Sequence, residues 1–520
     1  MQQKKVVSMT NRSRLPVIVG VHQITDQSSQ PENARGPKAL MAAAARGAAM
    51  DSGAPDILKE IDGLTVVRQF SDTLPRFTSP FGRMENPPWS VAREIGCSPK
   101  ELLYTTAGGH TPQIVVTRFC EEIAAGRLSC ALLVGAEALR TQHAAQKKSI
   151  VLDWSEAAPA PPKSFGVEQP SFSALEEKYG LNAAIYGYPV VEQAIRHHRG
   201  LSPSEHAHRM GLLMSRLAEV ACANPLATRR VPRTAEEIAS VSDTNPYIGY
   251  PYTRYMNANV FVDQSAAILL CSAEIADKFS VPETKRVYLH GTAAGNDHWF
   301  VTERDQMHRS PAVHDVVRRT LARAEIGVND VSHFDLYSCF PSAIEIACHE
   351  IGLSEDDPRN FTVTGGLPFF GGPGNNYVTH SIASMVQKLR SSRNAYGLVT
   401  ANGSYLAKHA AGLYSTRPIE GPWEHANSDG LQAYLDDIAK APLTDNVEGA
   451  ARIESYTLMV RNNVPEKAII VGRLQDNNQR FLANTSSNDP TLLQSFINQD
   501  RVGAEGKVET VDGKCQFILS

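Results

Sequence analysis

Four turns of the sequence contain residues that could bind or react with a substrate, and each turn follows an apolar run. One spans residues 105–113, and three follow one another between residues 334 and 412. In α/β proteins, reacting groups are commonly placed where a strand ends, a glycine turn follows and a helix begins. We therefore expect these turns to form the site. The candidate residues are Gly108, Gly109, Tyr337, Cys339, Gly372, His380, Asn402 and His409.

A histidine cluster in the middle of the chain is the other group with chemical potential. It consists of His197, His198, His206 and His208. A His-His pair followed by His-x-His, with neither cysteine nor clustered carboxylates nearby, is more typical of a solvated helix face than of a metal site. We therefore predict no metal site.

The composition excludes several classes of protein. The chain has 520 residues, 42% of them apolar and 20% charged, and a net charge of −4. This balance gives no basic surface for nucleic acid. The 8 cysteines form no CxxC motif, which indicates reduced intracellular thiols. No apolar run approaches the roughly 18 residues of a membrane span, and the polar N-terminus does not resemble a secretory signal. We expect a soluble, cytoplasmic protein.

Two stretches of alternating strand and helix patterns must position the four turns. In the first, β-branched or continuous apolar runs predict strands at residues 15–21, 61–68, 102–106 and 129–139, with helices at 38–51 and 114–126. In the second, strands are predicted at 287–292, 334–338, 362–365 and 396–403, with helices at 311–324, 341–351 and 376–390. The two stretches end alike, in CALLVGAE and YGLVTANG. A duplicated α/β unit explains this repetition.

Two further regions do not follow the alternation. Residues 140–255 open with the proline-rich APAPPKS and then show helical patterns, so we interpret them as an inserted loop or lid domain. After residue 417 a polar linker leads to a helix predicted at 431–440 and to short β-like runs at 452–460, 467–474 and 507–519. The last run contains Asp512-Gly513 between alternating flanks, which predicts a hairpin. We expect a small β-rich domain here, with a barrel as a candidate form.

Several of these motifs resemble the thiolase superfamily over about residues 14–416. They are VDQSAAILL at 262–270, DLYSCF at 335–340, GGLPFFGGP at 365–373 and the GHTPQ turn. FGGPGNNYVTHSIA and ANGSYLAKHAAGLYST are similar to the thiolase-like protein type 1 group, which has an additional C-terminal domain. The resemblance implies a five-layered αβαβα duplication. Its halves would span residues 14–275, including the insertion 140–255, and 283–416, with the appended β-rich domain at 425–520.

The resemblance also implies that the usual acyl-accepting cysteine is missing. Thiolases place a reactive thiolate in the first half of the chain, at the start of a helix. Here that position falls on Gly108, give or take one residue, and no cysteine lies between Cys97 and Cys120. Thr106 and Thr111 offer oxygen nucleophiles nearby, but the sequence shows no base to activate them. Formation of an acyl-enzyme is therefore not expected.

The other thiolase turns differ as well. The Gly-His-Pro turn reads Gly371-Gly372-Pro373, and the Cys-x-Gly turn begins with Asn402. Cys339 is retained where sterol-carrier-type thiolases use an acid/base cysteine, and Tyr337 replaces their histidine.

Three functions follow from this pattern. The first is a thiolase-like enzyme of the acyltransferase superfamily, which acts on a CoA thioester in lipid or acyl metabolism and carries no bound cofactor. The second is a lyase that splits β-hydroxyacyl-CoA by a retro-aldol reaction, with Tyr337, Cys339 and either His409 or His380 moving protons. The third is a non-catalytic acyl-CoA-binding protein. In each, Gly108, Gly109 and Gly372 would offer backbone N–H groups to the thioester oxygen.

Each candidate also has a purely structural interpretation. Cys339 and Tyr337 equally suit packed core positions, whereas His380 suits a helix position bonded to the backbone better than a catalytic one, and His409 is comparable. The partner expected in all three cases is acyl-CoA, with no nucleic acid and no membrane. The sequence leaves homodimer and monomer both open.

Overall fold

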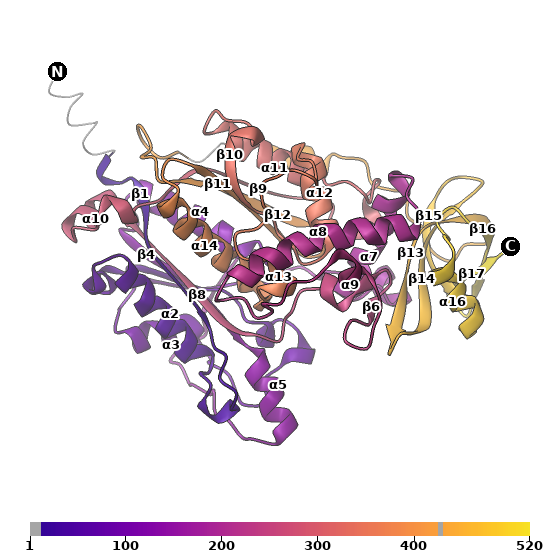
Figure 1. The fold of residues 1–520 in the computed structure, drawn as a ribbon, viewed down its shortest axis with the longest axis horizontal. Helices are drawn as coiled ribbons and strands as arrows, with labels where there is room; N and C mark the ends of the chain where they lie inside the picture. Colours follow the sequence, from indigo (N-terminus) through magenta and orange to yellow (C-terminus); the bar gives the residue numbers. More distant parts are fainter. Residues whose placement is uncertain (1–11, 425–429) are drawn as a thin grey trace.

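The computed structural model describes residues 12–424 and 430–520, which form two sheets, an inserted helical region and a barrel (Figure 1). The polar segment 1–11 and the predicted start of the appended domain at residue 425 lie outside the described residues. Within the described residues no helix combines the length and apolarity needed to cross a bilayer.

The two sheets share one strand order, which confirms the predicted duplication. The first sheet runs β1 (Pro16–Thr25), β8 (Asp263–Ser272), β4 (Cys130–Ala138), β2 (Gly63–Val66), β3 (Glu101–Thr105) and β5 (Lys163–Phe165). The second runs β9 (Tyr288–Asn296), β12 (Lys408–Ser415), β11 (Tyr396–Gly403) and β10 (Val331–Asp335). In both, the first two pairings are antiparallel and the third is parallel.

Helices complete the five layers. The first sheet is covered on its outside by α2 (Pro37–Asp51) and α3 (Pro87–Ile95), and the second by α11 (Pro311–Ala322) with α12 (Pro341–Ile351) beside it. The central layer is formed by α4 (Thr111–Ala124) and α14 (Tyr377–Ser391), which contact both sheets. Residues 377–386 of α14 are all buried because apolar sheet faces lie on both sides of the helix. The short helices α10 (Ala273–Lys278) and α13 (Gly366–Phe369) lie in connections.

The expected strand at residues 362–365 does not form. The Asp335 carboxylate, at the end of β10, accepts hydrogen bonds from the backbone N–H of Val363 and from the Thr362 hydroxyl, at 3.0 and 2.9 Å. The carboxylate therefore satisfies backbone donors that a strand would pair with a neighbour. This loop leads directly into the glycine-rich turn.

The insertion is mainly helical. It contains α5 (Leu139–Lys148), α6 (Ala174–Tyr179), α7 (Ala184–His198), α8 (Pro203–Ala223) and α9 (Ala235–Ala239), followed by the hairpin of β6 (Tyr247–Gly249) and β7 (Tyr252–Thr253). One part of it, β5, instead joins the first sheet and pairs in parallel with β3, so it covers an edge that would otherwise be open.

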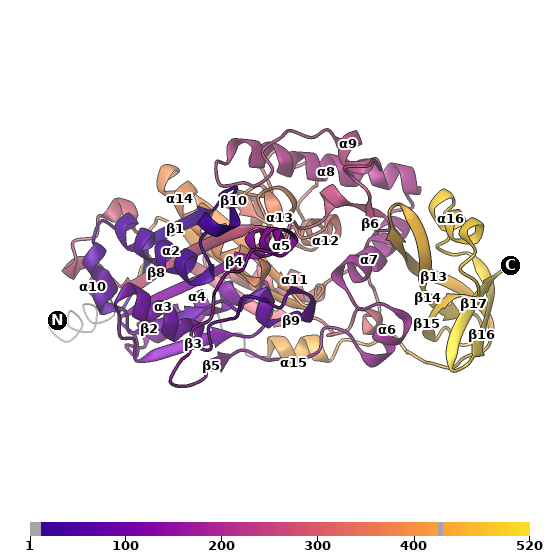
Figure 2. The same cartoon turned by 90° about the horizontal axis from the view of Figure 1, so that it is seen from below.

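The C-terminal strands close into a barrel at one end of the molecule, next to α7 (Figures 1 and 2). Its strands are β13 (Gly449–Arg461), β14 (Val464–Leu474), β15 (Arg480–Thr485), β17 (Lys514–Leu519) and β16 (Glu505–Val511), with α16 (Pro490–Asn498) packed on β14. The expected β16–β17 hairpin forms, and both Asp512 and Gly513 have positive φ. The preceding helix, α15 (Leu431–Asp436), is shorter than expected and packs on β9.

The barrel is joined to the second sheet region through a buried arginine. The Arg480 guanidinium donates to the carbonyl oxygens of Thr302 and Arg304 at 2.7 and 2.6 Å, and to the Glu454 carboxylate at 2.7 Å. Arg480 has no exposed surface. Its charge is balanced by Glu454, and the carbonyls satisfy its remaining donors.

Candidate active site

Tyr337, Cys339, Asn402 and Gly109 come together at the carboxyl ends of β10, β11 and β3. Tyr337 and Cys339 lie between β10 and α12, where the Tyr337 N–H donates to the Thr400 hydroxyl at 3.0 Å. A methyl group added at Gly109 would lie within 3.0 Å of the Tyr337 hydroxyl and 2.7 Å from the carbonyl oxygen of Asn402. The glycine turn therefore packs directly against the other two turns.

Tyr188, which the sequence reading did not select, completes this cluster from the inserted region. Its hydroxyl accepts a hydrogen bond from the Asn402 side-chain amide at 3.1 Å and also interacts with Cys339. Its ring stacks on Phe340, with centroids 4.5 Å apart. Tyr188 is far from the four turns in sequence, so no motif indicated it. We call Tyr188, Tyr337, Cys339 and Asn402 the tyrosine–cysteine cluster.

The titratable groups of this cluster are neutral at ordinary pH. Burial raises the pKa of the Cys339 thiol to about 12. Burial, together with the proximity of Cys339, also raises the pKa values of the Tyr337 and Tyr188 hydroxyls above their usual range. The cluster therefore offers uncharged hydrogen-bond donors rather than a thiolate or a phenolate.

His110 lies between the tyrosine–cysteine cluster and a cleft of about 730 Å³ that it helps to line. It precedes α4, and its Nδ1 is buried with no hydrogen-bond partner among the described residues. Methyl groups added at Gly108 or Gly403 would lie 2.5 and 2.8 Å from that nitrogen. Burial and the charge of Lys408 lower the pKa of His110 to about 3, so its ring is neutral and can accept a hydrogen bond. The feature of the sequence that could have indicated His110 is its position in GGHTPQ, where a helix begins.

His409 lines the same cleft and is opposite Asn402 in the β11–β12 ladder. Opposed residues of an antiparallel pair share a face, so the structure brings these two predicted residues together. The ring Nε2 of His409 is 2.9 Å from the Leu406 carbonyl oxygen and 3.3 Å from Asp297. Burial raises the pKa of Asp297, but the hydrogen bond and charge of His409 outweigh this effect, and the net pKa lies below its usual value.

Comparisons with known proteins agree with this geometry. The chain is 35% identical to a monomeric SCP2-thiolase-like protein type 1 from Mycobacterium smegmatis, with a TM-score of 0.83 over 98% of this chain and 99% of that one. This chain belongs to the SCP2-thiolase-like protein type 1 family. Residues 430–514 match the family model of the thiolase-like protein type 1 additional C-terminal domain.

More distant solved structures share the thiolase fold alone. An acetyl-CoA acetyltransferase from Syntrophomonas wolfei is 14% identical, with a TM-score of 0.55 over 78% of this chain and 99% of that one. The Ltp2-ChsH2(DUF35) aldolase is 18% identical, with a TM-score of 0.56 over 79% of this chain and 100% of that one. A search of curated proteins found no match.

In this thiolase-like protein, two of the three glycines expected to bind an oxyanion already use their N–H groups. The Gly108 N–H donates to the side-chain oxygen of Asn375 at 2.9 Å. The Gly372 N–H donates to the carbonyl oxygen of Asn259 at 2.8 Å. Of the three glycines, only Gly109 lies against Tyr337. Gly109 is therefore the strongest candidate to donate its N–H to an oxyanion.

His380 lies in the central helix α14, and its contacts are with the first sheet and the glycine-rich turn. Its Nδ1 is 2.9 Å from the side-chain oxygen of Gln23, and its ring packs against Phe370. Burial lowers its pKa to about 3. These contacts suit a residue that fixes the helix between the sheets. The predicted catalytic role of His380 stays a prediction.

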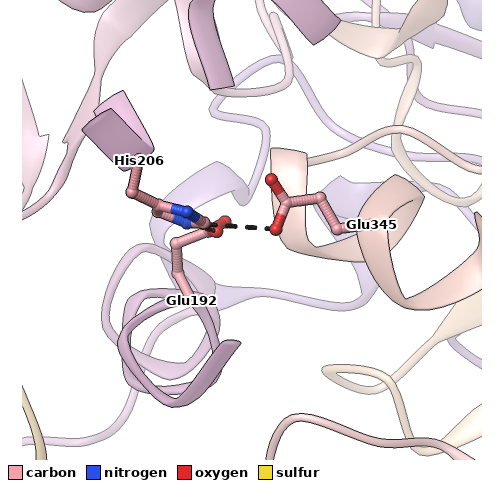
Figure 3. A group of neighbouring side chains, drawn as sticks. All are labelled: Glu192, His206 and Glu345. Atoms are coloured by element: carbon pink, nitrogen blue, oxygen red, sulfur yellow. Dashed lines mark hydrogen bonds and ion pairs between the residues drawn. The ribbon is translucent and has the colours of Figure 1, made fainter. Parts of the chain in front are cut away.

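The histidine cluster divides in the structure. His197, His198 and His208 are exposed, as expected for a solvated helix face, whereas His206 is buried. His206 faces Glu192 and Glu345, so the expectation that no carboxylates cluster near these histidines was wrong (Figure 3). The two glutamates lie 14 residues before and 139 residues after His206, so only the packing of three helices brings them together.

Proposed function

We propose that this protein binds an acyl-CoA thioester and acts on it without forming an acyl-enzyme. The observation that carries the proposal is the packing of the glycine turn at Gly108 and Gly109. A side chain at Gly108 would collide with the His110 ring, and one at Gly109 would collide with the Tyr337 hydroxyl and a backbone carbonyl. The turn therefore has no room for a nucleophilic side chain.

The tyrosine–cysteine cluster suits non-covalent chemistry on a thioester. A thioester oxygen that gains negative charge is stabilised by donors that are already oriented and shielded from water. The neutral hydroxyls of Tyr337 and Tyr188 and the Cys339 thiol are such donors. Their raised pKa values favour hydrogen-bond donation over proton abstraction at neutral pH.

A hydrogen-bond acceptor is available on the other side of the turn. His110 is neutral, and its Nδ1 lacks a partner among the described residues, so it can accept a hydrogen bond from a substrate that enters through the cleft. Lys408 borders the same cleft, where its ammonium donates to the Ala107 carbonyl at 3.3 Å and lies over the Trp299 ring. It adds positive charge near the substrate.

Cleavage of a β-hydroxyacyl-CoA is the second candidate, and it is favoured by the same lack of a nucleophile. In that reaction the β-hydroxyl loses its proton to a base, the bond between the α- and β-carbons breaks, and its electron pair moves into the thioester enolate. A carbonyl compound leaves, and a proton then returns to the enolate carbon. His409, which lines the same cleft, would take the proton, and Tyr337 would donate a hydrogen bond to the enolate oxygen. The likeness to an aldolase is compatible with this reaction.

Two measurements on the full-length protein test the proposal. Mass spectrometry of the protein after incubation with acyl-CoA is expected to show no added acyl group, while calorimetry shows acyl-CoA binding. Chromatography then follows the products from acyl-CoA and β-hydroxyacyl-CoA substrates. Tyr337→Phe is expected to lower turnover more than binding, because its hydroxyl acts on the developing charge.

Each result separates the candidate functions. A stable acyl adduct would overturn the non-covalent proposal. Binding without any turnover would identify the protein as an acyl-CoA carrier or sensor. Absence of binding at millimolar acyl-CoA would exclude all three functions.

A further inference from the structure

A buried group of two carboxylates and one imidazole lies close to the tyrosine–cysteine cluster, on helices that also lead to Tyr188 and Cys339. Glu192 is on α7, His206 on α8 and Glu345 on α12 (Figure 3). Each residue offers one ligand atom, and these atoms all lie within 4.8 Å of one another. All three residues are 1% exposed or less. Among the described residues no other group of histidine, cysteine and carboxylate side chains has this spacing.

Glu345 is the member that requires an explanation. Both of its carboxylate oxygens are buried and have no hydrogen-bond partner among the described residues. Its nearest basic neighbours are Arg199, with an N–O distance of 3.3 Å, and the His206 ring at 3.9 Å, and the Glu192 carboxylate is close enough to share a proton with it. A buried carboxylate without hydrogen bonds is costly, so it must be neutralised by a proton or by a cation.

The arginines nearby do not supply enough positive charge. Arg199 and Arg209 both pair with Glu355, and Arg199 also reaches Glu345. Together with Glu192, this region holds three carboxylates against two guanidinium groups. Burial raises the pKa values of Glu192 and Glu345, so an excess charge where Glu192, His206 and Glu345 meet is neutralised either by a proton or by a metal ion.

We propose that Glu192, His206 and Glu345 bind a divalent transition-metal ion such as Zn²⁺. One imidazole nitrogen and two carboxylate oxygens are a ligand set that Zn²⁺ accepts, at about 2.0–2.2 Å from each atom, with a fourth position for water. The His206 Nε2 and the Glu192 carboxylate are now 2.5 Å apart and share a hydrogen bond. Metal binding replaces this hydrogen bond, moves the two atoms apart and releases the shared proton.

The surroundings hold Glu192 in the orientation that this site needs. Its second carboxylate oxygen accepts a hydrogen bond from the Tyr252 hydroxyl at 2.5 Å, and that hydroxyl is 2.7 Å from Ser342. Such contacts to the outer oxygen of a metal ligand fix the direction of the inner one. Ser342 is on α12, as is Glu345, so the same helix contributes a ligand and a contact to the Tyr252 hydroxyl that orients Glu192.

The ion would fix the inserted region against the candidate active site. Tyr188 is one turn before Glu192 on α7, and α12 begins directly after Phe340. The Phe340 ring lies between the Tyr188 and Tyr252 rings, with centroids 4.5 and 5.1 Å away. Joining α7 to α12 through a metal ion therefore also fixes the distance between Tyr188 and Cys339.

Zinc titration of the full-length protein tests the proposal and does not depend on catalysis. The protein is dialysed against a chelator, then against chelator-free buffer, and titrated with ZnCl₂ in a calorimeter at neutral pH. Bound zinc is then counted by elemental analysis. We expect one Zn²⁺ per chain and at least a tenfold weaker affinity in Glu345→Gln, which keeps the side-chain shape but loses the charge. Co²⁺ bound in place of zinc should show the visible absorption of a low-coordinate nitrogen–oxygen site.

Two control variants distinguish this site from surface histidines. His208→Gln changes an exposed histidine of the same helix α8 and should bind zinc as the unmodified protein does. His308→Gln removes one ring of a stacked pair with His198, whose centroids are 4.0 Å apart, and this pair is a potential adventitious zinc site. Zinc binding should survive this change.

The opposite results would overturn the proposal. They are absence of stoichiometric zinc in the unmodified protein, loss of zinc with His308→Gln, or unchanged affinity in a folded Glu345→Gln variant. If that variant does not fold, the zinc count in the unmodified protein and in His308→Gln decides alone. Absence of zinc in both would mean that a proton, shared between the glutamates, neutralises the group.

Discussion

Gly109→Ala is the substitution that most directly tests the packing of the glycine turn at Gly108 and Gly109. The added methyl group would lie within 3.0 Å of the Tyr337 hydroxyl and 2.7 Å from the backbone oxygen of Asn402, both well inside van der Waals contact. The Tyr337 ring is held edge-on against Tyr377, and the Asn402 carbonyl belongs to a strand, so neither retreats easily. Overpacking of this kind costs about 1–3 kcal/mol. Loss of glycine flexibility in the unfolded chain offsets about 0.4–1 kcal/mol, which leaves a net destabilisation of about 0–2.6 kcal/mol, and the two contacts below 3.0 Å favour the upper part of this range.

Hydrogen exchange of the first turn of α4 is the suitable measurement, because a chain of this size does not unfold in one step. A loss of about 1–2 kcal/mol in local opening free energy corresponds to roughly 5–30-fold faster exchange. Gly327→Ala is the matched control. Gly327 has a φ of −103°, and no atom would approach its added methyl group closer than 3.7 Å. That variant should be as stable as the unmodified protein or slightly more stable.

A double-mutant cycle shows whether Tyr337 causes the effect. Tyr337→Phe removes the hydroxyl, after which the nearest ring carbon would still lie 2.8 Å from the new methyl group. The double variant should therefore recover part of the lost stability, with a coupling free energy of about 0.5–3 kcal/mol. Unchanged exchange in Gly109→Ala would refute the reasoning. It would mean that the turn has room for a side chain and that a nucleophile there is not excluded by packing.

Three further predictions concern the thiols, the barrel and acid stability. Iodoacetamide at pH 8 should alkylate the half-buried Cys222 well before Cys339. The reason is that the Cys339 thiol, with a pKa of about 12, is ionised at that pH in about one molecule in 10⁴. Peptide mapping measures the order of alkylation. Arg480→Met should destabilise the protein by about 1–3 kcal/mol, seen as a lower melting temperature, because the buried carbonyl oxygens of Thr302 and Arg304 lose their donor while Glu454 keeps Arg473. Arg452→Met, on the exposed barrel surface, should not. The pKa of Asp297 is lower in the folded than in the unfolded protein. Its carboxylate therefore stabilises the fold fully above pH 3.8, the usual pKa of the group, and this stabilisation is lost as the pH falls through the lower pKa of the folded protein. Asp297→Asn should remove this part of the acid sensitivity of the melting temperature.

The elements around the site could be predicted because their signals are local. The run at residues 341–351 has helical spacing and a proline at its first position, and α12 has those bounds. The glycine turns mark strand ends, and three of them do meet at Gly109, Tyr337 and Asn402. The loop at 362–365 looked like a strand because its composition is β-like, but the buried Asp335 carboxylate satisfies its backbone donors instead.

The inserted region could not be predicted in the same way. Tyr188 reaches Asn402 across 214 residues of sequence, and Glu192 and Glu345 meet through the packing of two helices that no motif relates. Only the face that bears the histidine cluster was expected to be solvated, yet α7 and α8 each bury polar groups against α12. Buried polar side chains on an otherwise ordinary amphipathic helix give no periodic signal, since one Glu or Tyr on the inner face hardly changes the pattern.

The backbone between β11 and β12 indicates that this site is held in a defined shape. Ser404, Tyr405 and Leu406 all have positive φ, between 46° and 63°, a conformation that costs about 1–2 kcal/mol for each residue. Such strain persists only where the surroundings determine it. Here the Tyr405 ring packs on Phe172 with centroids 4.3 Å apart, its carbonyl accepts from Arg304 at 3.0 Å, and the Leu406 carbonyl is bonded to the His409 ring. The turn after Asn402 is therefore fixed against the inserted region. A scaffold that only enclosed a ligand loosely would not need this strained turn, so the geometry favours a site that orients its substrate.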